Sequence, residues 1–282
     1  MKEIILRTKI KIVNNNSVYC VVFRWQLSIK KFYNNETEYS DGSIEDEILN
    51  MVKNTDDFES ILDNDLRWPV FYHLSYLREN LFNWYPFNED SNLLEIGAGC
   101  GALTGLFCDK VSKVIAVELT DRRSQIIYNR HKDCPNLEIF PGNLNNMDFE
   151  EKFDYIILCG VLEYASLFTQ TNNPHVDFLK KIKSMLSEDG VILVAIENRI
   201  GLKYFSGSKE DHLSRCFIGI DNYPDIDPND DPLGKYVDEI IYKSFRKYKN
   251  RQCLNCTSLL SKGLSAKNCN KKHHIFKIYF DK

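Results

Sequence analysis

The stretch NLLEIGAGCGALTGLF, residues 92–107, is the feature that most constrains the fold of this chain. An apolar run ends in three glycines at alternating positions, Gly97, Gly99 and Gly101, and a helical pattern follows. Glycine adopts positive φ and lets a ligand approach the main chain because it has no Cβ. A strand, a bare turn and the N-terminus of a helix therefore predict a site for a nucleotide-like ligand.

Short apolar runs and helical patterns alternate after this turn. Buried parallel strands read as nearly continuous apolar runs, and 153–160 is such a run. Five alternations predict a mostly parallel, doubly wound α/β sheet with helices on both faces. The expected strands are 92–96, 113–119, 137–142, 153–160 and 191–197, and the expected helices are 102–110, 121–132 and 175–190, the last ended by Gly190.

The regions on either side of this core are less regular. Residues 1–40 hold β-like runs that suit a hairpin, and a helical pattern follows SDG at 40–42. A helix after Pro69, with Leu74, Leu77 and Leu81 on one stripe, is expected to pack on the core. Beyond 225 we expect a loop, a helix at 235–250 and a last strand at 275–280. The predicted segments are an N-terminal helical cap at 1–90, a core at 91–224 and an atypical C-terminal segment at 225–282.

Composition limits the classes of partner. The formal net charge of the 282 residues is −4, so no basic field points to nucleic acid or to an anionic membrane. No apolar run approaches the roughly 20 residues that span a bilayer. The first residues lack the apolar block of a signal peptide, and the nine cysteines suit reduced thiols. We therefore expect a cytoplasmic protein with no nucleic-acid partner and no membrane span.

The glycine spacing distinguishes between cofactors. The dinucleotide fingerprint is G-x-G-x-x-G, whereas this chain has Glu95-x-Gly97-x-Gly99-x-Gly101. A carboxylate two residues before the first glycine suits a cationic ligand better than a pyrophosphate. S-adenosylmethionine carries a sulfonium and an ammonium and no phosphate. A nicotinamide-dependent reductase is the alternative enzyme, and glycines needed only for packing are the alternative without a ligand.

This E-x-G-x-G-x-G form resembles the first motif of the class I S-adenosylmethionine-dependent methyltransferases, which have a Rossmann-like sheet. Glu118 follows Gly97 by 21 residues, where an acid can accept hydrogen bonds from ribose hydroxyls. The resemblance further implies that Asn143 binds the adenine amine, or else is a plain turn asparagine, and that the segment after the fourth strand lies along the cofactor. The predicted cofactor-binding residues are Glu95, Gly97, Ala98, Gly99, Gly101, Glu118, Asn143, Cys159 and Gly160.

Two further stretches look like a bacterial group of these enzymes that accompanies glycosyltransferases of surface-polysaccharide pathways. They are WPVFYHLSYLRENLFNWYPF at 68–87 and IENRIGLKYFSGSKEDHLSRCFIGIDNYP at 196–224. The resemblance implies a methyltransferase that acts on the hydroxyl of a glycan or related small acceptor, with glycosyltransferase pathway partners. It runs from about Tyr39 to Pro224, and the two ends depart from the pattern of the group.

A sugar hydroxyl is a poor nucleophile, so a general base would help its methylation by about 10²–10⁴-fold. His212, next to Glu210 and Asp211, is the predicted catalytic residue, and an exposed charged turn is the alternative. His73 is a second candidate base, for which packing on a helix face is the favoured interpretation.

Two other functions stay open at this point. The C-terminus could leave a fold that binds cofactor without catalysis. Alternatively, a zinc-stabilised interaction module could form from Cys253, Cys256, Cys269 and His273, although reduced thiols are favoured and no metal ligand is assigned.

Overall fold

The computed structural model describes residues 40–197, 201–210 and 214–221, and only the backbone of three strands at 10–12, 251–255 and 275–280. Apart from the strand at 10–12, the expected hairpin before residue 40 lies outside the described residues, and so does the helix expected at 235–250. The chain divides into two compact units, Met1–Tyr155 and Ile156–Lys282. The three predicted segments, 1–90, 91–224 and 225–282, stay a prediction.

Three parallel strands form the centre of the first unit. They are β2 (Asn92–Ile96), β3 (Lys113–Glu118) and β4 (Leu137–Pro141), in the order β4-β3-β2. The register aligns Glu95 with Ala116 and Glu118 with Pro141, so the carboxyl ends of the strands meet at one edge. Ligands of such sheets bind beyond this edge.

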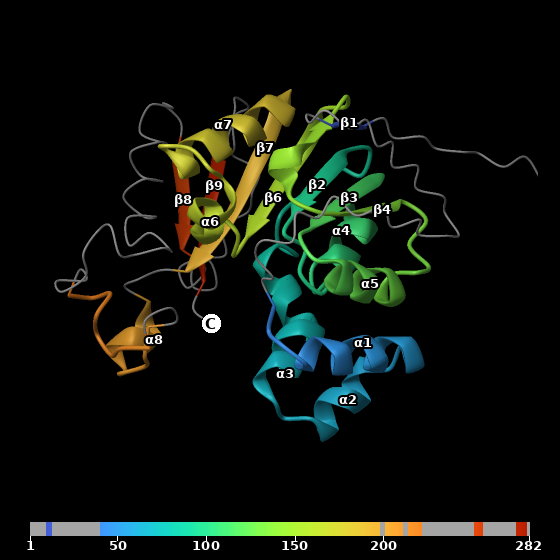
Figure 1. Cartoon of the computed structure of the whole chain (residues 1–282), viewed down its shortest axis with the longest axis vertical. Helices are drawn as coiled ribbons and strands as arrows, with labels where there is room; N and C mark the ends of the chain where they lie inside the picture. The colour runs from blue at the N-terminus through green and yellow to red at the C-terminus, as the bar shows by residue number, and fades with distance from the viewer. Residues whose placement is uncertain are drawn as a thin grey trace, which may run out of the picture. The chain divides into compact units, whose positions relative to one another are not determined.

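Two helices follow the first two strands, as the sequence predicts. The helix α4 (Thr104–Lys110) begins after the glycine turn, and α5 (Asp121–Arg130) packs against β3 and β4 (Figure 1). The side chain of Thr120 caps α5 by accepting a hydrogen bond from the N–H of Arg123 at 3.3 Å. Asp121 in the first turn and Arg130 in the last complement the helix dipole.

The N-terminal helical cap consists of α1 (Ile44–Asn54), α2 (Phe58–Asn64), α3 (Trp68–Leu74) and the 3-10 turn η1 (Tyr76–Leu81). The expected helix at Pro69 is present as α3, but its expected continuation through Leu77 and Leu81 was wrong, because Ser75 interrupts it. The backbone of Ser75 is extended, with ψ of 131°, and its hydroxyl accepts a hydrogen bond from the N–H of Leu77 at 3.2 Å. A serine that caps a new turn thus ends the predicted stripe at Leu74.

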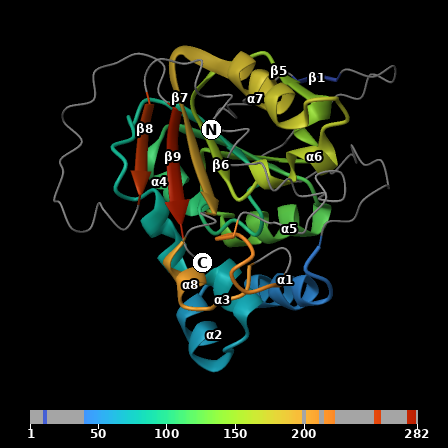
Figure 2. The ribbon, with the colours of Figure 1, turned by 90° about the vertical axis from the view of Figure 1, so that its left-hand side faces the viewer.

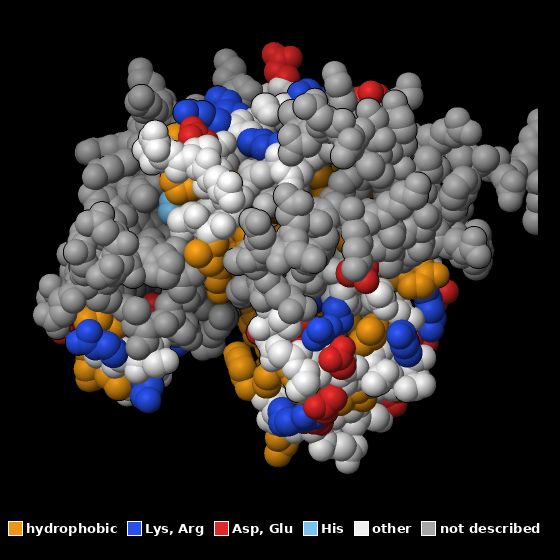
Figure 3. All heavy atoms as spheres, viewed as in Figure 1, with side chains coloured by type: hydrophobic (Ala, Val, Ile, Leu, Met, Phe, Trp, Pro, Cys, Tyr) orange, Lys and Arg blue, Asp and Glu red, His pale blue; other side chains and the backbone are white. Residues whose placement is uncertain are grey.

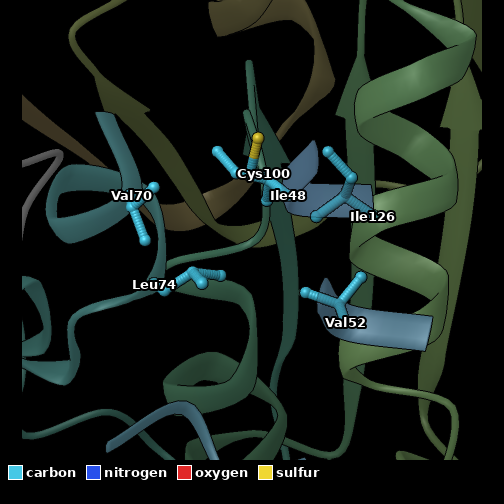
Figure 4. Packing of buried hydrophobic residues seen from close by; sticks show 6 residues of the cluster. All are labelled: Ile48, Val52, Val70, Leu74, Cys100 and Ile126. Atoms are coloured by element: carbon cyan, nitrogen blue, oxygen red, sulfur yellow. The ribbon is translucent and has the colours of Figure 1, made fainter. Parts of the chain in front are cut away.

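The cap packs on α5 through an apolar cluster (Figure 4). Ile48 and Val52 come from α1, Val70 and Leu74 from α3, and Ile126 from α5. Figure 4 shows that Cys100 of the glycine turn belongs to the same cluster. The cap therefore covers the glycine turn directly.

The first unit also contains a small antiparallel pair that the sequence did not predict. The strand β1 (Ile10–Ile12) pairs with β5 (Met147–Phe149), which follows the 3-10 turn η2 (Leu144–Asn146).

The second unit has its own parallel strands (Figure 2). The strand β7 (Leu186–Glu197) pairs with β9 (Ile275–Phe280), and β9 pairs with β8 (Arg251–Asn255). At the end of β6 (Phe153–Cys159), the N–H of Gly160 donates to Ala195 of β7 at 3.0 Å. The helical elements are η3 (Leu162–Tyr164), α6 (Ala165–Phe168), α7 (Pro174–Met185) and α8 (Leu202–Phe205).

Two expectations for this unit need correction. The helix predicted to end at Gly190 ends at Met185, because the backbone turns extended at Leu186 and β7 already begins there. The strand at 275–280 is confirmed, but β8 was missed, since RQCLN lacks the alternation of a half-buried strand. The parallel strands with flanking helices confirm the predicted Rossmann-like α/β fold class.

The packing of the cap gives a first prediction. Replacing the fully buried Ile48 by alanine should lower the free energy of unfolding by about 2–5 kcal/mol, because a cavity is left between α1 and α5. Leu66, which is 91% exposed, is the control, and Leu66→Ala should change stability by no more than about 0.5 kcal/mol. Urea denaturation measures both. Equal midpoints for the two variants would contradict the packing of the cap on this unit.

Candidate cofactor site

The glycine turn folds back on the end of β3. The N–H groups of Gly97 and Ala98 both donate to the carbonyl of Val117, at 2.8 and 3.2 Å. The φ angles are +67° at Gly97, +59° at Gly99 and +75° at Gly101. Residues other than glycine rarely adopt this backbone conformation. The backbone of the turn therefore requires glycine at all three positions.

Two of these glycines face different surroundings. A Cβ added to Gly101 would lie 3.0 Å from the His131 ring, whose Nε2 is 2.8 Å from the carbonyl of Gly101. A Cβ on Gly99 would meet no atom within 4 Å. Gly101 is thus needed for packing, whereas Gly99 leaves open space into which a ligand could fit.

Glu118 joins the tip of β3 to the turn. Its Oε2 accepts a hydrogen bond from the N–H of Gly99 at 2.8 Å, and its Oε1 accepts one from the N–H of Thr120 at 3.1 Å. The side chain is buried, and this burial raises the pKa of Glu118, while the charge of Arg123 and the two backbone N–H groups oppose the rise. Glu118 and the glycine turn therefore lie close enough to share one adenosine-sized ligand.

Glu95 lies buried near the end of β2, and its Oε2 accepts a hydrogen bond from the Thr104 hydroxyl at 2.7 Å. Burial raises the pKa of Glu95 to about 8, against the effect of Thr104. At neutral pH the carboxyl group therefore mostly holds a proton, unless a cation approaches it.

Arg130 links the turn to the cap. Its Nη1 donates to the carbonyls of His73 and Cys100, both at 2.7 Å. Burial lowers the pKa of Arg130 to about 10, so the guanidinium stays charged at neutral pH. One partly buried cation thus joins α3 to the glycine turn.

Asn143 follows Gly142, whose N–H donates to the carbonyl of Glu118 at 2.8 Å. The Oδ1 of Asn143 accepts a hydrogen bond from the N–H of Asn145 at 2.9 Å, and so Asn143 caps η2. The structure thus brings Asn143 next to Glu118 and gives it a turn-capping contact. Adenine binding by Asn143 stays a prediction.

The remaining predicted residues are not all brought together. Cys159 and Gly160 end β6 in the second unit, where Gly160 has φ of +64° and open space at its Cβ position. His212 lies outside the described residues. His73 is buried, with Nε2 2.8 Å from Asp41 Oδ2, as the packing interpretation expects.

Most of the candidate zinc ligands lie outside the described residues. Cys256, Cys269 and His273 lie outside the described residues, and only the backbone of Cys253 is described, in β8. Within the described part of the chain, no group of three potential ligands could hold a metal ion.

Sequence reasoning missed several residues that build the site. Thr104 contacts Glu95 from the first turn of α4, and His131 and Arg130 reach the carbonyls of the glycine turn from the end of α5. The helical spacing of residues 121–132 placed them on a helix. It gave no signal of which carbonyls their side chains would reach.

Comparisons with known proteins match the part of the chain that contains the glycine turn. Residues 94–192, about a third of the chain, match the family model described as a methyltransferase domain. A probable ribosomal RNA small subunit methyltransferase A of Methanosarcina barkeri is 42% identical over 65 residues, which cover 23% of this chain and 22% of that protein. An uncharacterized methyltransferase of Staphylococcus carnosus is 28% identical over 114 residues, covering 40% and 51%.

Among solved structures, phosphoethanolamine N-methyltransferase 1 of Haemonchus contortus, in complex with phosphoethanolamine and S-adenosylhomocysteine, aligns with a TM-score of 0.41. It is 16% identical, and the alignment covers 56% of this chain and 33% of that one. The chain spans about a quarter of the length of the archaeal curated relatives that it matches.

The match of residues 94–192 to a methyltransferase domain supports the predicted enzyme class and its predicted cofactor, S-adenosylmethionine. Membership of the glycosyltransferase-associated group stays a prediction. The expectation of no nucleic-acid partner has no support, since several relatives are named as ribosomal RNA methyltransferases. No helix in the described part of the chain is long and apolar enough to cross a membrane.

Glu95 gives a prediction about pH. Its pKa of about 8 in the folded state exceeds the ordinary 4.5, so its contribution to stability is full below pH 4.5 and is lost as pH rises through 8. Glu95→Gln should therefore raise the free energy of unfolding at pH 8.5, by on the order of 3 kcal/mol, and change it little at pH 4.5.

Denaturation curves at the two pH values test this effect of Glu95→Gln. The exposed Glu89 provides the control, since Glu89→Gln should leave stability unchanged at both. A loss of stability at pH 8.5 in Glu95→Gln would show that the folded protein uses the ionised carboxylate.

Proposed function

We propose that this chain binds S-adenosylmethionine at the glycine turn and transfers its methyl group to a hydroxyl of a glycan or a related small acceptor. The observation that carries the cofactor site is the contact between Gly99 and Glu118, next to the open space at the Cβ position of Gly99. The cofactor supplies an electrophilic methyl group on a sulfonium, with a thioether as the leaving group.

In this proposal the Glu118 carboxylate binds the ribose by accepting hydrogen bonds from its hydroxyls. Each carboxylate oxygen can accept two hydrogen bonds. Oε2 accepts one, from the N–H of Gly99, while Oε1 accepts one from the N–H of Thr120 and a longer one, at 3.5 Å, from the Thr120 hydroxyl. Ribose hydroxyls are donors of the kind that the remaining lone pairs could accept. The backbone contacts hold the carboxylate in one orientation before the ligand arrives, which lowers the entropy cost of binding.

Glu95 is proposed to respond to the cationic end of the cofactor. A buried carboxyl group that is mostly protonated at pH 7 becomes a carboxylate when a positive charge approaches, because the charge lowers its pKa. Cofactor binding would then release a proton. The affinity is expected to rise with pH up to about 8, and Glu95→Gln should weaken binding while it strengthens the fold.

The other residues keep narrower roles in the proposal. Gly97, Ala98 and Gly101 shape the turn, and Asn143 is proposed to bind the adenine amine. From the family resemblance, Cys159 and Gly160 are proposed to line the cofactor.

The acceptor is proposed from the resemblance of residues 68–87 and 196–224 to the glycosyltransferase-associated group, with glycosyltransferases of the same pathway as partners. The named base is His212, which would take the proton of the acceptor hydroxyl. If it does so, His212→Ala should lower turnover by about 10²–10⁴-fold without changing cofactor affinity.

A second candidate is methylation of RNA, which is favoured by the names of the relatives that share 65–70 residues with this chain. The net charge of −4 weighs against it, because RNA binding relies on clustered basic side chains. On the face shown in Figure 3, acidic and basic side chains are interspersed over the helices of the cap. A protein that binds cofactor without turnover is the third candidate.

The glycine turn gives a prediction of cofactor affinity. Gly99→Val should abolish binding of S-adenosylhomocysteine, measured by calorimetry, because the side chain fills the space proposed for the ligand. Gly99→Ala should weaken binding at least tenfold. Gly207→Ala is the matched control, since Gly207 also has a positive φ, +89°, and its added Cβ would lie 3.8 Å from the Phe217 ring, an ordinary contact, so it carries similar backbone strain. Equal affinity in Gly99→Ala and Gly207→Ala would refute the placement.

The acceptor can be identified by transfer of a labelled methyl group from S-adenosylmethionine. Purified protein is incubated in parallel with surface glycans, with ribosomal RNA and with no acceptor. We expect label on the glycan and its loss with Gly99→Val. Label on RNA alone would favour the second candidate, and cofactor binding without transfer to either would favour the inactive form.

A further inference from the structure

A buried cluster of charges connects the cap to the cofactor acid. Its centre is Arg123 of α5, which is 6% exposed. The Nε of Arg123 donates to Glu45 Oε1 at 2.8 Å, and its Nη2 donates to Asp41 Oδ2 at 3.1 Å. Both acceptors belong to the first residues of the cap, about 80 positions earlier in the chain.

The cap side of this cluster is itself fixed. Glu45, which is 1% exposed, also accepts hydrogen bonds from the N–H of Asp41 at 2.9 Å and the hydroxyl of Ser40 at 3.1 Å. His73 of α3 donates to the same Asp41 oxygen as Arg123 does. A carboxylate only accepts, so this contact requires the proton on Nε2 of His73.

Thr120 connects Arg123 to Glu118. Its N–H donates to Glu118 Oε1 at 3.1 Å, and its hydroxyl oxygen accepts a hydrogen bond from the N–H of Arg123 at 3.3 Å. Burial raises the pKa of Glu118, and the positive charge of Arg123 is the largest effect that opposes it. The other acid groups that act on Glu118 have the same sign as its own charge. They are Glu45 of α1 and Glu95 of β2, which interact unfavourably with the Glu118 carboxylate. Arg123 is therefore the nearby cation that supports the ionised form.

We propose that Asp41 and Glu45 of the cap are positioning residues for the cofactor, because they hold Arg123 where its charge keeps the Glu118 carboxylate ready to accept the ribose hydroxyls. This inference rests on the proposed function of Glu118. It assigns a role in cofactor binding to residues that precede the matched methyltransferase domain, which begins at residue 94.

Burying the charges of Arg123 and Glu45 costs desolvation free energy, which is hard to explain if the ion pair only holds the cap in place. A buried ion pair is often no more stabilising than apolar side chains of the same volume, since both charges lose their hydration. The cap already packs on α5 through Ile48, Val52 and Ile126. If the positive charge of Arg123 stabilises the Glu118 carboxylate, this explains why an arginine is buried at this position.

A double-mutant cycle tests the coupling. Kd for S-adenosylhomocysteine is measured by calorimetry for the whole chain and for Arg123→Met, Glu118→Gln and the double variant. We expect each single change to weaken binding by about 10–100-fold and the double variant to bind no worse than the weaker single one. Losses that multiply would overturn the proposal.

Arg122 provides a matched control on the same helix. Its Nη1 donates to the carbonyl of Gly42 at 3.0 Å, and its Nε lies 3.2 Å from Asp46, so it also binds the cap. Its Nη1 also lies 3.7 Å from Glu45 Oε2, whereas Arg123 contacts Oε1 of the same carboxylate at 2.8 Å. Glu45 therefore keeps its contact with Arg123 when Arg122 is replaced. Arg122→Met should therefore leave Kd within about twofold of the wild type. A loss equal to that of Arg123→Met would mean that cap docking alone matters.

A second measurement needs no cofactor. The pKa of Glu118 is followed by carboxyl-carbon NMR in the unliganded protein. It should rise in Arg123→Met, rise less in Asp41→Asn, which removes one hydrogen-bond partner of Arg123, and stay constant in Arg122→Met. If Arg123→Met does not fold, Arg123→Lys retains the charge, so its Glu118 pKa should lie closer to the wild type than that of Asp41→Asn. A constant Glu118 pKa across the folded variants would overturn the inference.

The two proposals fail in different ways. Wild-type protein that binds no S-adenosylhomocysteine removes the proposed function, and this inference with it, whatever the NMR titration shows. Wild-type binding that is lost in Glu118→Gln, together with independent effects of Arg123→Met, removes this inference alone.

Discussion

The contact between the N–H of Gly99 and the carboxylate of Glu118 is the interaction on which the arrangement of this site depends. It joins a turn after one strand to the tip of the next, and so fixes the edge of the sheet at which ligands bind. The turn can make this contact only because φ is positive at Gly97, Gly99 and Gly101. A rigid backbone here suits the proposed methyl transfer, since most of that task is alignment of the cofactor.

Burial of charge is the second constraint, and the two acids of the site meet it differently. Glu95 has a hydroxyl partner, Thr104, and keeps its proton near neutral pH. Glu118 has two backbone donors and the charge of Arg123, which favour the carboxylate. This difference suits the proposed roles, in which Glu95 responds to a cation and Glu118 accepts hydrogen bonds from hydroxyls. The cap takes part in this difference because it supplies the partners of Arg123.

Much of the first unit could be predicted from the sequence, because its signals are local. The strands at 92–96 and 113–118 and the turn between β2 and α4 follow from apolar runs and glycine spacing. The predictions that were wrong involve competition between local structures. Ser75 capped a new turn where the Leu stripe predicted a continuous helix, and residues 186–190 joined β7 although Gly190 is a plausible helix end. Intrinsic helix and strand propensities alone do not determine which local structure forms at these positions, since strand pairing and packing outweigh them.

The sequence by itself determined the alternating fold, the bare turn and the acid that follows it by 21 residues, because each is set by neighbours along the chain. Only the tertiary structure decided that Asp41, Glu45 and His73 meet around Arg123, and that Arg130 joins the carbonyls of His73 and Cys100. These partners lie about 30–80 positions apart. Their meeting depends on how α1 and α3 pack on α5, and no local pattern of residues encodes that packing.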